Sequence, residues 1–294
     1  MAFLTVAIWG STFVFTKMLL LNGLSPAQIF TLRFIMAYVL LLIFELVTRG
    51  RSFRWFSRSW RDELAMLLLG LSGGSVYFLT ENAAMLFTTA TNTSLIVCSC
   101  PLFAMLLVAL VYRQSERFTR MQVVGSLLAC LGMAAVVLNG RFVLHLSPLG
   151  DILAFGACLC WAVYSLLMKS VTERYSTFFI TRKVFFYGLL TILPYYLVFP
   201  GFPSLEVILS PQVLWNLLFL GVVASMVCFL VWNWVIRQLG AVVATNWVYF
   251  NPITTILFAW WLLHEQITLW FLFGTALILM GLYLCDRKGK VSKH

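Results

Sequence analysis

Charged residues are scarce in this chain of 294 residues: Asp, Glu, Lys and Arg together make up 10% of it. A soluble globular domain carries roughly 25% charged residues. Hydrophobic residues reach 62% here, and the mean hydropathy is +0.96. This composition excludes a soluble globular protein, a disordered chain and a disulfide-rich secreted module. It predicts an all-α membrane protein with many spanning segments.

Residues that build catalytic or metal centres are also few. The three histidines, at positions 145, 264 and 294, are far apart, so they offer no metal-binding box. Neither the H-E-x-x-H pattern nor the phosphate-binding loop G-x-x-x-x-G-K-[ST] occurs. All seven cysteines fall in apolar stretches, where they are expected as small core residues and not as disulfides or zinc ligands. The sequence therefore predicts neither an enzyme nor a cofactor.

Long apolar stretches divide the chain, and about 20 apolar residues suffice for a helix to cross the hydrocarbon core. Such uniformly apolar runs favour helices over the alternating strands of a membrane barrel. The connections are short and leave no room for a soluble domain. The ten predicted transmembrane helices are residues 2–21, 27–47, 63–83, 91–112, 120–139, 149–169, 178–199, 212–236, 242–263 and 267–285.

Most basic residues are assigned to one side of these spans. Of the 20 Lys and Arg, Lys17 and Arg33 lie inside spans and Arg141 lies on the opposite side. The others are Arg49, Arg51, Arg54, Arg58, Arg61, Arg113, Arg117, Arg120, Lys169, Arg174, Arg182, Lys183, Arg237, Arg287, Lys288, Lys290 and Lys293. The positive-inside rule then predicts that both termini are cytoplasmic, and the compact chain favours a bacterial inner membrane. The same placement explains the net charge of +10 without a nucleic-acid partner.

The two halves of the chain resemble each other. Trp9 and Lys17 match Trp161 and Lys169 at an offset of 152 residues. Further matches follow in the same order, with offsets of 151 and then 149: Gly70, Phe78, Leu79, Asn82 and Pro101 with Gly221, Phe229, Leu230, Asn233 and Pro252, then Glu116, Gly125 and Gly132 with Glu265, Gly274 and Gly281.

This self-similarity predicts two five-helix repeats, residues 1–140 and 149–286, followed by a basic cytoplasmic tail at 287–294. Because five is odd, the second repeat must enter the membrane from the opposite side. Inverted repeats are typical of carriers that alternate access to a site near the midplane.

Several of these motifs resemble the drug/metabolite transporter superfamily, in particular the EamA-type ten-helix exporters. They are W-G-S-T-F-V-F-T-K at 9–17, the pair Arg33-Phe34, and Asn251-Pro252 followed by Glu265 and the glycines 274 and 281. The resemblance implies a basket of ten helices around a central cavity, which exports small metabolites, commonly amino acids. The first repeat has Cys100-Pro101 where the second has Asn251-Pro252, so the halves are not expected to play equal roles.

We therefore expect a secondary transporter that exports amino acids or related small metabolites and works as a monomer or weak dimer in the lipid bilayer. The alternatives are a sugar-phosphate, nucleotide-sugar or drug carrier of the same superfamily, or a channel. Saturable, stereoselective flux separates a carrier from a channel.

Charges inside spans need a specific reason, because hydrocarbon solvates them poorly. Lys17 is expected to contact a substrate carboxylate, to reach the outer surface or to form a structural pair. Arg33 either serves the same anionic region or pairs with Glu81, and Glu81 is a candidate for proton exchange. Glu45 is expected to be solvated at the membrane interface.

Amides and aromatic residues complete the candidate site. Asn82 and Asn233 occupy equivalent places in the two repeats, where they either join helices or approach the cavity. Glu116 and Glu265 are assigned instead to capping the helices that follow them. The full predicted substrate-binding set is Trp9, Ser11, Thr12, Lys17, Arg33, Glu81, Asn82, Trp161, Tyr164, Trp232, Asn233, Asn246 and Tyr249.

Overall fold

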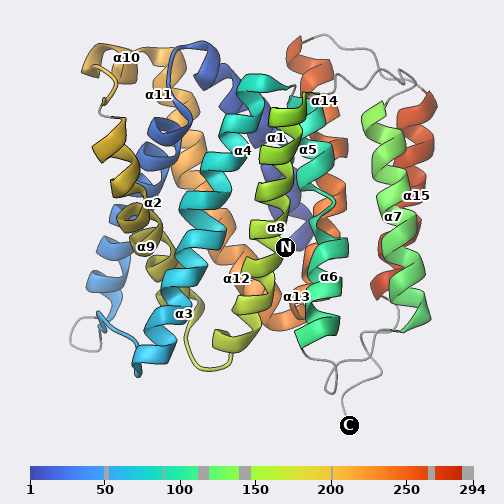
Figure 1. Ribbon diagram of the computed structural model, residues 1–294, viewed down its shortest axis with the longest axis horizontal. Coiled ribbons are helices and arrows are strands. Elements are labelled where there is room, and N and C mark those ends of the chain that lie inside the picture. Colours follow the sequence, from blue (N-terminus) through green and yellow to red (C-terminus); the bar gives the residue numbers. More distant parts are fainter. Residues whose placement is uncertain are drawn as a thin grey trace.

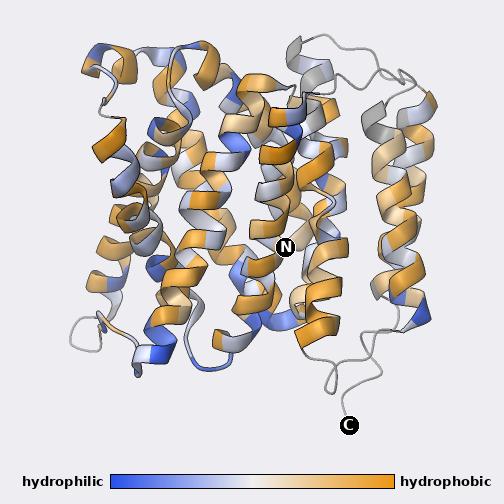
Figure 2. Cartoon of the chain, viewed as in Figure 1, coloured by the Kyte–Doolittle hydropathy of each residue, from blue (hydrophilic) through white to orange (hydrophobic). Residues whose placement is uncertain are grey.

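The structure is a computed structural model that describes residues 1–49, 53–88, 90–111, 119–138, 147–199, 201–263 and 269–286. Within these ranges all regular elements are helices, and no strand occurs. The long helices run side by side with their axes roughly aligned (Figure 1). Hydrophobic residues cover their length, and hydrophilic residues gather toward the two ends of the bundle (Figure 2). The prediction of an all-α membrane protein is confirmed.

The first half of the chain contains seven α-helices and one π-helical segment among its described residues. They are α1 (Ala2–Leu21), α2 (Pro26–Arg49), α3 (Trp60–Gly70), η2 (Leu71–Ser75), α4 (Val76–Phe87), α5 (Ala90–Val97), α6 (Cys100–Val111) and α7 (Arg120–Leu138). Helices α3 and α4 follow each other through η2, which is kinked at the non-helical residue Gly74, and the three together occupy the third predicted span.

The second half repeats this order with two additional short elements, α10 and η4. Its elements are α8 (Pro148–Val171), α9 (Thr177–Val198), α10 (Leu205–Leu209), α11 (Pro211–Leu218), η3 (Phe219–Val227), α12 (Cys228–Leu239), α13 (Ala241–Asn246), η4 (Trp247–Phe250), α14 (Asn251–Leu263) and α15 (Leu269–Asp286). Serine side chains accept a backbone N–H at the starts of several helices, as Ser147 does for α8 and Ser176 for α9.

Helices therefore occupy all ten stretches that the sequence predicts as spans. Among the described residues, eight helices or continuous helical segments are long and apolar enough to cross a membrane. Two shorter apolar helices, at 120–135 and 272–285, lie in the fifth and tenth predicted stretches.

Irregular turns occur at matching places in the two halves. The π-helical η2 interrupts the third predicted span, and the π-helical η3 interrupts the eighth. Helices α5 and α6 are separated at residues 98–99, and the 3₁₀ turn η4 separates α13 from α14. Each interruption in the first half lies about 151 residues before its counterpart in the second half, the same offset that relates Pro101 to Pro252. Such interruptions free backbone groups and are frequent at functional sites.

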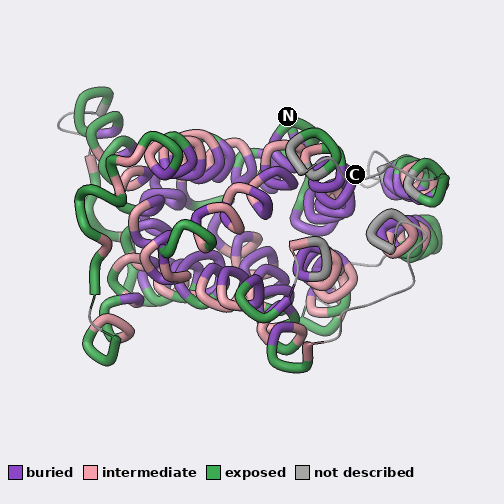
Figure 3. The backbone as a smooth tube through the Cα atoms, turned by 90° about the horizontal axis from the view of Figure 1, so that it is seen from above, coloured by how far each residue is buried: buried purple, intermediate pink, exposed green. Residues whose placement is uncertain are grey.

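Helices α7 and α15 form a pair at one end of the molecule (Figures 1 and 3). A methyl group at Gly125 would lie 2.6 Å from the carbonyl oxygen of Gly281. One at Gly132 would lie 2.7 Å from that of Gly274. The glycines thus let the two backbones approach closely, and the order of the contacts makes the pair antiparallel.

The structure corrects the sequence assignment of three charged residues. Arg182 and Lys183, which we counted with the basic residues on one side of the membrane although both fall within the predicted span 178–199, lie inside α9 and are each only 2% exposed. Glu45, expected to be solvated at the interface, is 1% exposed, and its Oε2 accepts a hydrogen bond from Arg182 Nε at 2.6 Å. Because both side chains are buried, each charge is more stable beside its counter-ion than alone. The order of charges along the sequence does not show which residues will pair.

Candidate functional site

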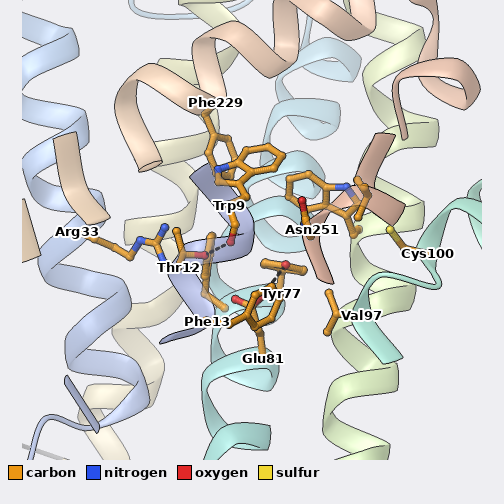
Figure 4. Close-up of a pocket in the computed structure, with 13 residues that line it drawn as sticks. Trp9, Thr12, Phe13, Arg33, Tyr77, Glu81, Val97, Cys100, Phe229 and Asn251 are labelled. Atoms are coloured by element: carbon orange, nitrogen blue, oxygen red, sulfur yellow. Dashed lines mark hydrogen bonds between the residues drawn. The ribbon is translucent and has the colours of Figure 1, made fainter. Parts of the chain in front are cut away.

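A cavity lies in the middle of the bundle, between helices of both halves (Figure 4). Its volume is about 30 Å³, which is enough for water but too small for an amino acid. The residues that line it are Trp9, Thr12, Phe13, Arg33, Tyr77, Phe78, Glu81, Val97, Cys100, Trp161, Phe229, Val248 and Asn251. Five of the thirteen predicted site residues are therefore brought together here: Trp9, Thr12, Arg33, Glu81 and Trp161.

The guanidinium of Arg33 enters the cavity from α2 (Figure 4). Its Nε donates to Ser225 Oγ at 2.9 Å, and its central carbon lies 4.5 Å from the centre of the Phe78 ring. Ser225 belongs to η3, so a π-helical turn supplies the acceptor that orients this side chain. Within the described part of the chain, the two terminal nitrogens of Arg33 have no hydrogen-bond acceptor.

The carboxylate of Glu81 enters the same cavity from α4. Its Oε1 accepts a hydrogen bond of 2.8 Å from the hydroxyl of Tyr77, one helical turn earlier. Oε2 has no hydrogen-bond donor among the described residues. The direct pairing of Arg33 with Glu81 that the sequence left open is absent from the described structure, since no nitrogen–oxygen distance between them is within 4.0 Å.

Aromatic rings form the remaining wall of the cavity. The Trp9 indole donates its N–H to the carbonyl of Ala224 in η3 at 2.9 Å. Its ring centre lies 5.3 Å from that of Trp161 in an edge-to-face arrangement and 5.7 Å from that of Phe229. Edge-to-face pairs at these distances stabilise a cluster beyond the area that they bury. The Trp161 N–H is buried without an acceptor in the described structure.

Lys17, a predicted site residue, does not line the cavity in this structure. Its ammonium donates to the carbonyl oxygen of Met85 at 2.6 Å, near the C-terminal end of α4. A cation there also interacts favourably with the negative end of the helix dipole. The structure therefore shows Lys17 in a contact between α1 and α4.

The two equivalent amides, Asn82 and Asn233, likewise lie outside the cavity lining and contact neighbouring helices. Asn82 donates to the carbonyl of Pro26 at 3.1 Å. Asn233 accepts a hydrogen bond of 2.5 Å from Tyr164 and donates to Thr181 at 2.8 Å. These contacts correspond to the helix-joining alternative for both residues.

The other predicted residues outside the lining are also buried. Ser11 donates to the carbonyl of Ile8 in its own helix. Asn246 and Tyr249 both contact the hydroxyl of Ser126 on α7, at 3.3 and 3.2 Å. The ring of Trp232 packs 5.0 Å from Trp9, directly behind the cavity wall. Glu116 and Glu265 lie outside the described residues.

Sequence reasoning missed eight of the lining residues, and two of them could have been found. Tyr77 precedes Glu81 by four residues, so both lie on one face of a helix. Asn251 stands beside a proline within a span, where an amide needs a partner, and its Oδ1 has none among the described residues. The other six, Phe13, Phe78, Val97, Cys100, Phe229 and Val248, are apolar or weakly polar residues without a distinguishing sequence signal.

A second group of charges lies away from the cavity, between α2, α3 and α9. We call Glu45, Asp62, Glu63, Arg174, Arg182 and Lys183 the α2–α3–α9 ion cluster. In it Arg182 pairs with Glu45, Lys183 with Glu63 and Arg174 with Asp62.

Tyrosine hydroxyls complete this ion cluster. Tyr187 donates to Glu63, and Tyr175 donates to Asp62 Oδ2 at 2.8 Å. Burial, together with the contact to the Asp62 carboxylate, raises the pKa of Tyr175 above its ordinary value of 10.0. The Tyr175 hydroxyl therefore keeps its proton to a higher pH than an ordinary tyrosine and remains a donor to Asp62.

One spacing typical of hydrolases, G-x-S-x-G, does occur at Gly70–Gly74. Its serine, Ser72, lies in η2 and donates to the carbonyl of Leu68 in the preceding turn at 2.7 Å. A methyl group at Gly73 would collide with the ring of Tyr164. The segment is thus a close helix contact in this structure, with the serine directed at its own backbone.

Comparisons with known proteins place the chain among transporters. A sequence profile of the EamA-like transporter family matches residues 1–138 and 148–285. The chain is 26% identical to an "uncharacterized transporter" of Archaeoglobus fulgidus, over 97% of this chain and 96% of the relative.

Two relatives carry more specific names. One, a "probable terminal-alkyne amino-acid exporter" of Streptantibioticus cattleyicolor, is 26% identical over 97% of this chain and 92% of its own. The other, a "probable amino-acid metabolite efflux pump" of Salmonella typhimurium, is 27% identical over 97% and 93%. A crystal structure with 17% sequence identity aligns with a TM-score of 0.71 over 96% of this chain and 97% of its own, which shows a shared fold.

Proposed function

Since the chain belongs to the EamA-like transporter family, we propose that it is a secondary transporter that exports amino acids or related small metabolites by alternating access. The observation that carries the proposal is the central cavity, which helices of both halves line and which holds two buried side chains of opposite charge. A buried cavity with converging polar groups is the usual form of a small-molecule site.

The small size of the cavity favours a carrier over a channel. An amino acid does not fit into about 30 Å³, so the aromatic wall must move before a substrate enters. No continuous pore is then needed: one conformation opens the cavity to one side, and a second opens it to the other.

The proposed architecture is ten transmembrane helices in two inverted repeats, with both termini in the cytoplasm of a bacterial cell. It is supported by the family match to each half, by the corresponding positions of η2 and η3, and by the antiparallel glycine contacts of α7 and α15. Helices α7 and α15 are then the fifth and tenth spans.

The class of substrate is supported by the names of the two amino-acid exporters among the relatives. The cavity is compatible with that class, because one cationic and one anionic side chain face it together. A sugar phosphate carries two negative charges and would face Glu81 as well as Arg33, which disfavours that alternative.

Counterflow in proteoliposomes tests the proposal. Vesicles that contain the purified full chain are loaded with unlabelled L-amino acids, and uptake of the labelled L- and D-forms is measured. We expect saturable, stereoselective uptake that internal substrate accelerates. Flux that neither saturates nor responds to internal substrate would identify a channel.

A pair of cysteine variants connects this transport to the cavity. Cys100→Phe places a ring into the cavity and is expected to abolish counterflow. Cys130→Phe makes the same change on α7, at a half-buried position that does not line the cavity, and should retain it. Equal transport by both variants would contradict the assignment of the cavity as the site.

A further inference from the structure

Two ionisable side chains face the central cavity without pairing with each other. Arg33 is 2% exposed and Glu81 is 7% exposed, and they enter from different helices, α2 and α4. Each makes one side-chain hydrogen bond, Arg33 to Ser225 and Glu81 to Tyr77. The terminal nitrogens of Arg33 and Oε2 of Glu81 have no other partner in the described part of the chain.

Such an arrangement is costly unless something else supplies the missing partners. A buried charge without a counter-ion loses several kcal/mol of hydration free energy. The same protein avoids this cost in the α2–α3–α9 ion cluster, where carboxylates and cations are in direct contact. A molecule that carries both charges would complete both groups of the cavity at once.

We propose that Arg33 and Glu81 are the two poles of a zwitterion site, in which Arg33 binds the α-carboxylate and Glu81 the α-ammonium of a free amino acid. The inference rests on the proposed function and specifies how its cavity recognises substrate. It assigns a separate task to each residue, so each can be tested with a different analogue.

The contacts around each pole hold it in a form suited to this task. With Nε occupied by Ser225 and its plane against Phe78, Arg33 presents its two terminal amino groups, which match a carboxylate. Tyr77 occupies one oxygen of Glu81 and leaves the other for an ammonium. Asn251 Oδ1, buried and without a donor among the described residues, is a second acceptor on the cavity wall.

The rest of the wall limits the substrate's side chain. Trp9, Trp161 and Phe229 offer aromatic faces and edges, which favour aromatic or large apolar side chains. A third charge on the substrate would have no counter-ion among the lining residues, because Arg33 and Glu81 are the only charged groups there in the described chain. We therefore expect neutral amino acids to be preferred over acidic and basic ones.

Analogues that lack one charge provide the test. The purified full chain in detergent is titrated with L-phenylalanine, phenethylamine and 3-phenylpropionate, and with L-leucine, isoamylamine and 4-methylpentanoate. Binding is followed by the concentration dependence of the melting temperature. We expect at least one of the two amino acids to bind at least about tenfold more tightly than either of its singly charged analogues, because each lost contact is a charged hydrogen bond.

Two variants should each remove the preference for the amino acid over one of its two analogues. In Glu81→Gln, the amino acid should bind no better than the carboxylate analogue, to within about threefold. In Arg33→Gln, it should bind no better than the amine. Glu206→Gln on α10 and Arg237→Gln at the end of α12 make the same changes outside the cavity lining and should keep the wild-type ratios.

The ratios of amino-acid affinity to analogue affinity distinguish a zwitterion site from a merely structural role of Arg33 and Glu81. They also allow the zwitterion site to fail independently of the proposed function. Equal losses for the amino acid and both analogues in each variant would overturn the zwitterion site, as would the absence of amino-acid binding. Should a glutamine variant fail to fold, Glu81→Asp and Arg33→Lys keep the charge and should keep the preference in weakened form. If the zwitterion site is overturned but the protein still shows counterflow of other solutes, the proposed transporter function stands. If no solute shows counterflow, the proposed function is contradicted as well.

Discussion

The central cavity and the α2–α3–α9 ion cluster use the same side chains in opposite ways. In the ion cluster, Lys183 contacts Glu63 and Arg182 contacts Glu45, so each buried charge has a counter-ion from another helix. In the cavity, Arg33 and Glu81 face a common space and have only uncharged hydrogen-bond partners. All of these residues are largely buried, so burial alone does not distinguish the two groups.

The difference indicates what each group is for. Paired charges satisfy each other and join three helices, and removing one partner exposes the other to an apolar environment. Unpaired charges lower the stability of the empty protein and gain their partners when a ligand arrives. Stability and ligand binding should therefore respond in opposite directions when the two groups are mutated.

The largest expected effect comes from breaking the ion cluster. Lys183→Met leaves the Glu63 carboxylate without its counter-ion and should lower the free energy of unfolding by about 3–5 kcal/mol. Glu81→Gln removes an incompletely partnered charge and should leave stability equal to or above that of the wild type. Unfolding in SDS titrations of the purified protein measures both variants.

A double variant checks the cause of that loss. In Lys183→Met/Glu63→Leu no charge is left unpaired, and more than half of the lost stability should return. If Lys183→Met unfolds like the wild type, or if Glu81→Gln loses more than Lys183→Met, the distinction between paired and unpaired groups is wrong.

A contact without any charge extends the comparison to α7 and α15. Gly132→Ala places a methyl group 2.7 Å from the carbonyl oxygen of Gly274 and should lower stability by about 1–3 kcal/mol, less than the broken ion pair. Gly156→Ala is the matched control, since its methyl group would lie 3.8 Å from the nearest atom, Thr80 Cγ2. SDS titration again gives the values, and similar losses in both variants would show that α7 and α15 tolerate separation.

A smaller effect is expected from the residue that orients Arg33. Ser225→Ala removes the acceptor of the Arg33 Nε and, at roughly 1 kcal/mol per hydrogen bond, should weaken amino-acid binding about fivefold. Because Ser225 acts through Arg33, the affinity for the corresponding amine, which lacks a carboxylate, should not change. Ser165→Ala alters another buried serine, which donates to the carbonyl of Trp161 in its own helix and accepts from Thr245 on α13, and should leave both affinities intact.

The sequence predicted the helices well, because twenty apolar residues bounded by polar or Gly/Pro segments leave few other structures. The first helix is found at 2–21 as predicted, and the second begins one residue earlier and ends two residues later than the predicted 27–47. The sequence could not predict which charges are paired. Arg182 and Glu45 are 137 positions apart, and only the packing of α2 against α9 brings them together.

The cavity was predicted in part, for a related reason. Embedded charges and tryptophans are conspicuous in a sequence, and Arg33, Glu81, Trp9 and Trp161 do meet at one site. Which amides join helices and which face the cavity depends on rotation of each helix about its axis. Helices packed on several sides carry little amphipathic signal for that rotation, so Asn82 and Asn251 could not be told apart.

The smallest effect on stability is expected at Lys17, which tests whether a charge can belong to neither the paired nor the unpaired group. Its ammonium contacts the carbonyl of Met85 near the end of α4, so it resembles neither the ion pairs nor the unpaired cavity residues. Lys17→Met should lower stability by only about 0.3–1 kcal/mol, the usual value of a cation at a helix C-terminus, and leave counterflow unchanged. If Lys17→Met loses counterflow while its free energy of unfolding stays near that of the wild type, Lys17 must reach the substrate in another conformation. The anionic pole of the substrate would then be shared between Lys17 and Arg33, and the cavity would no longer balance one positive against one negative side chain.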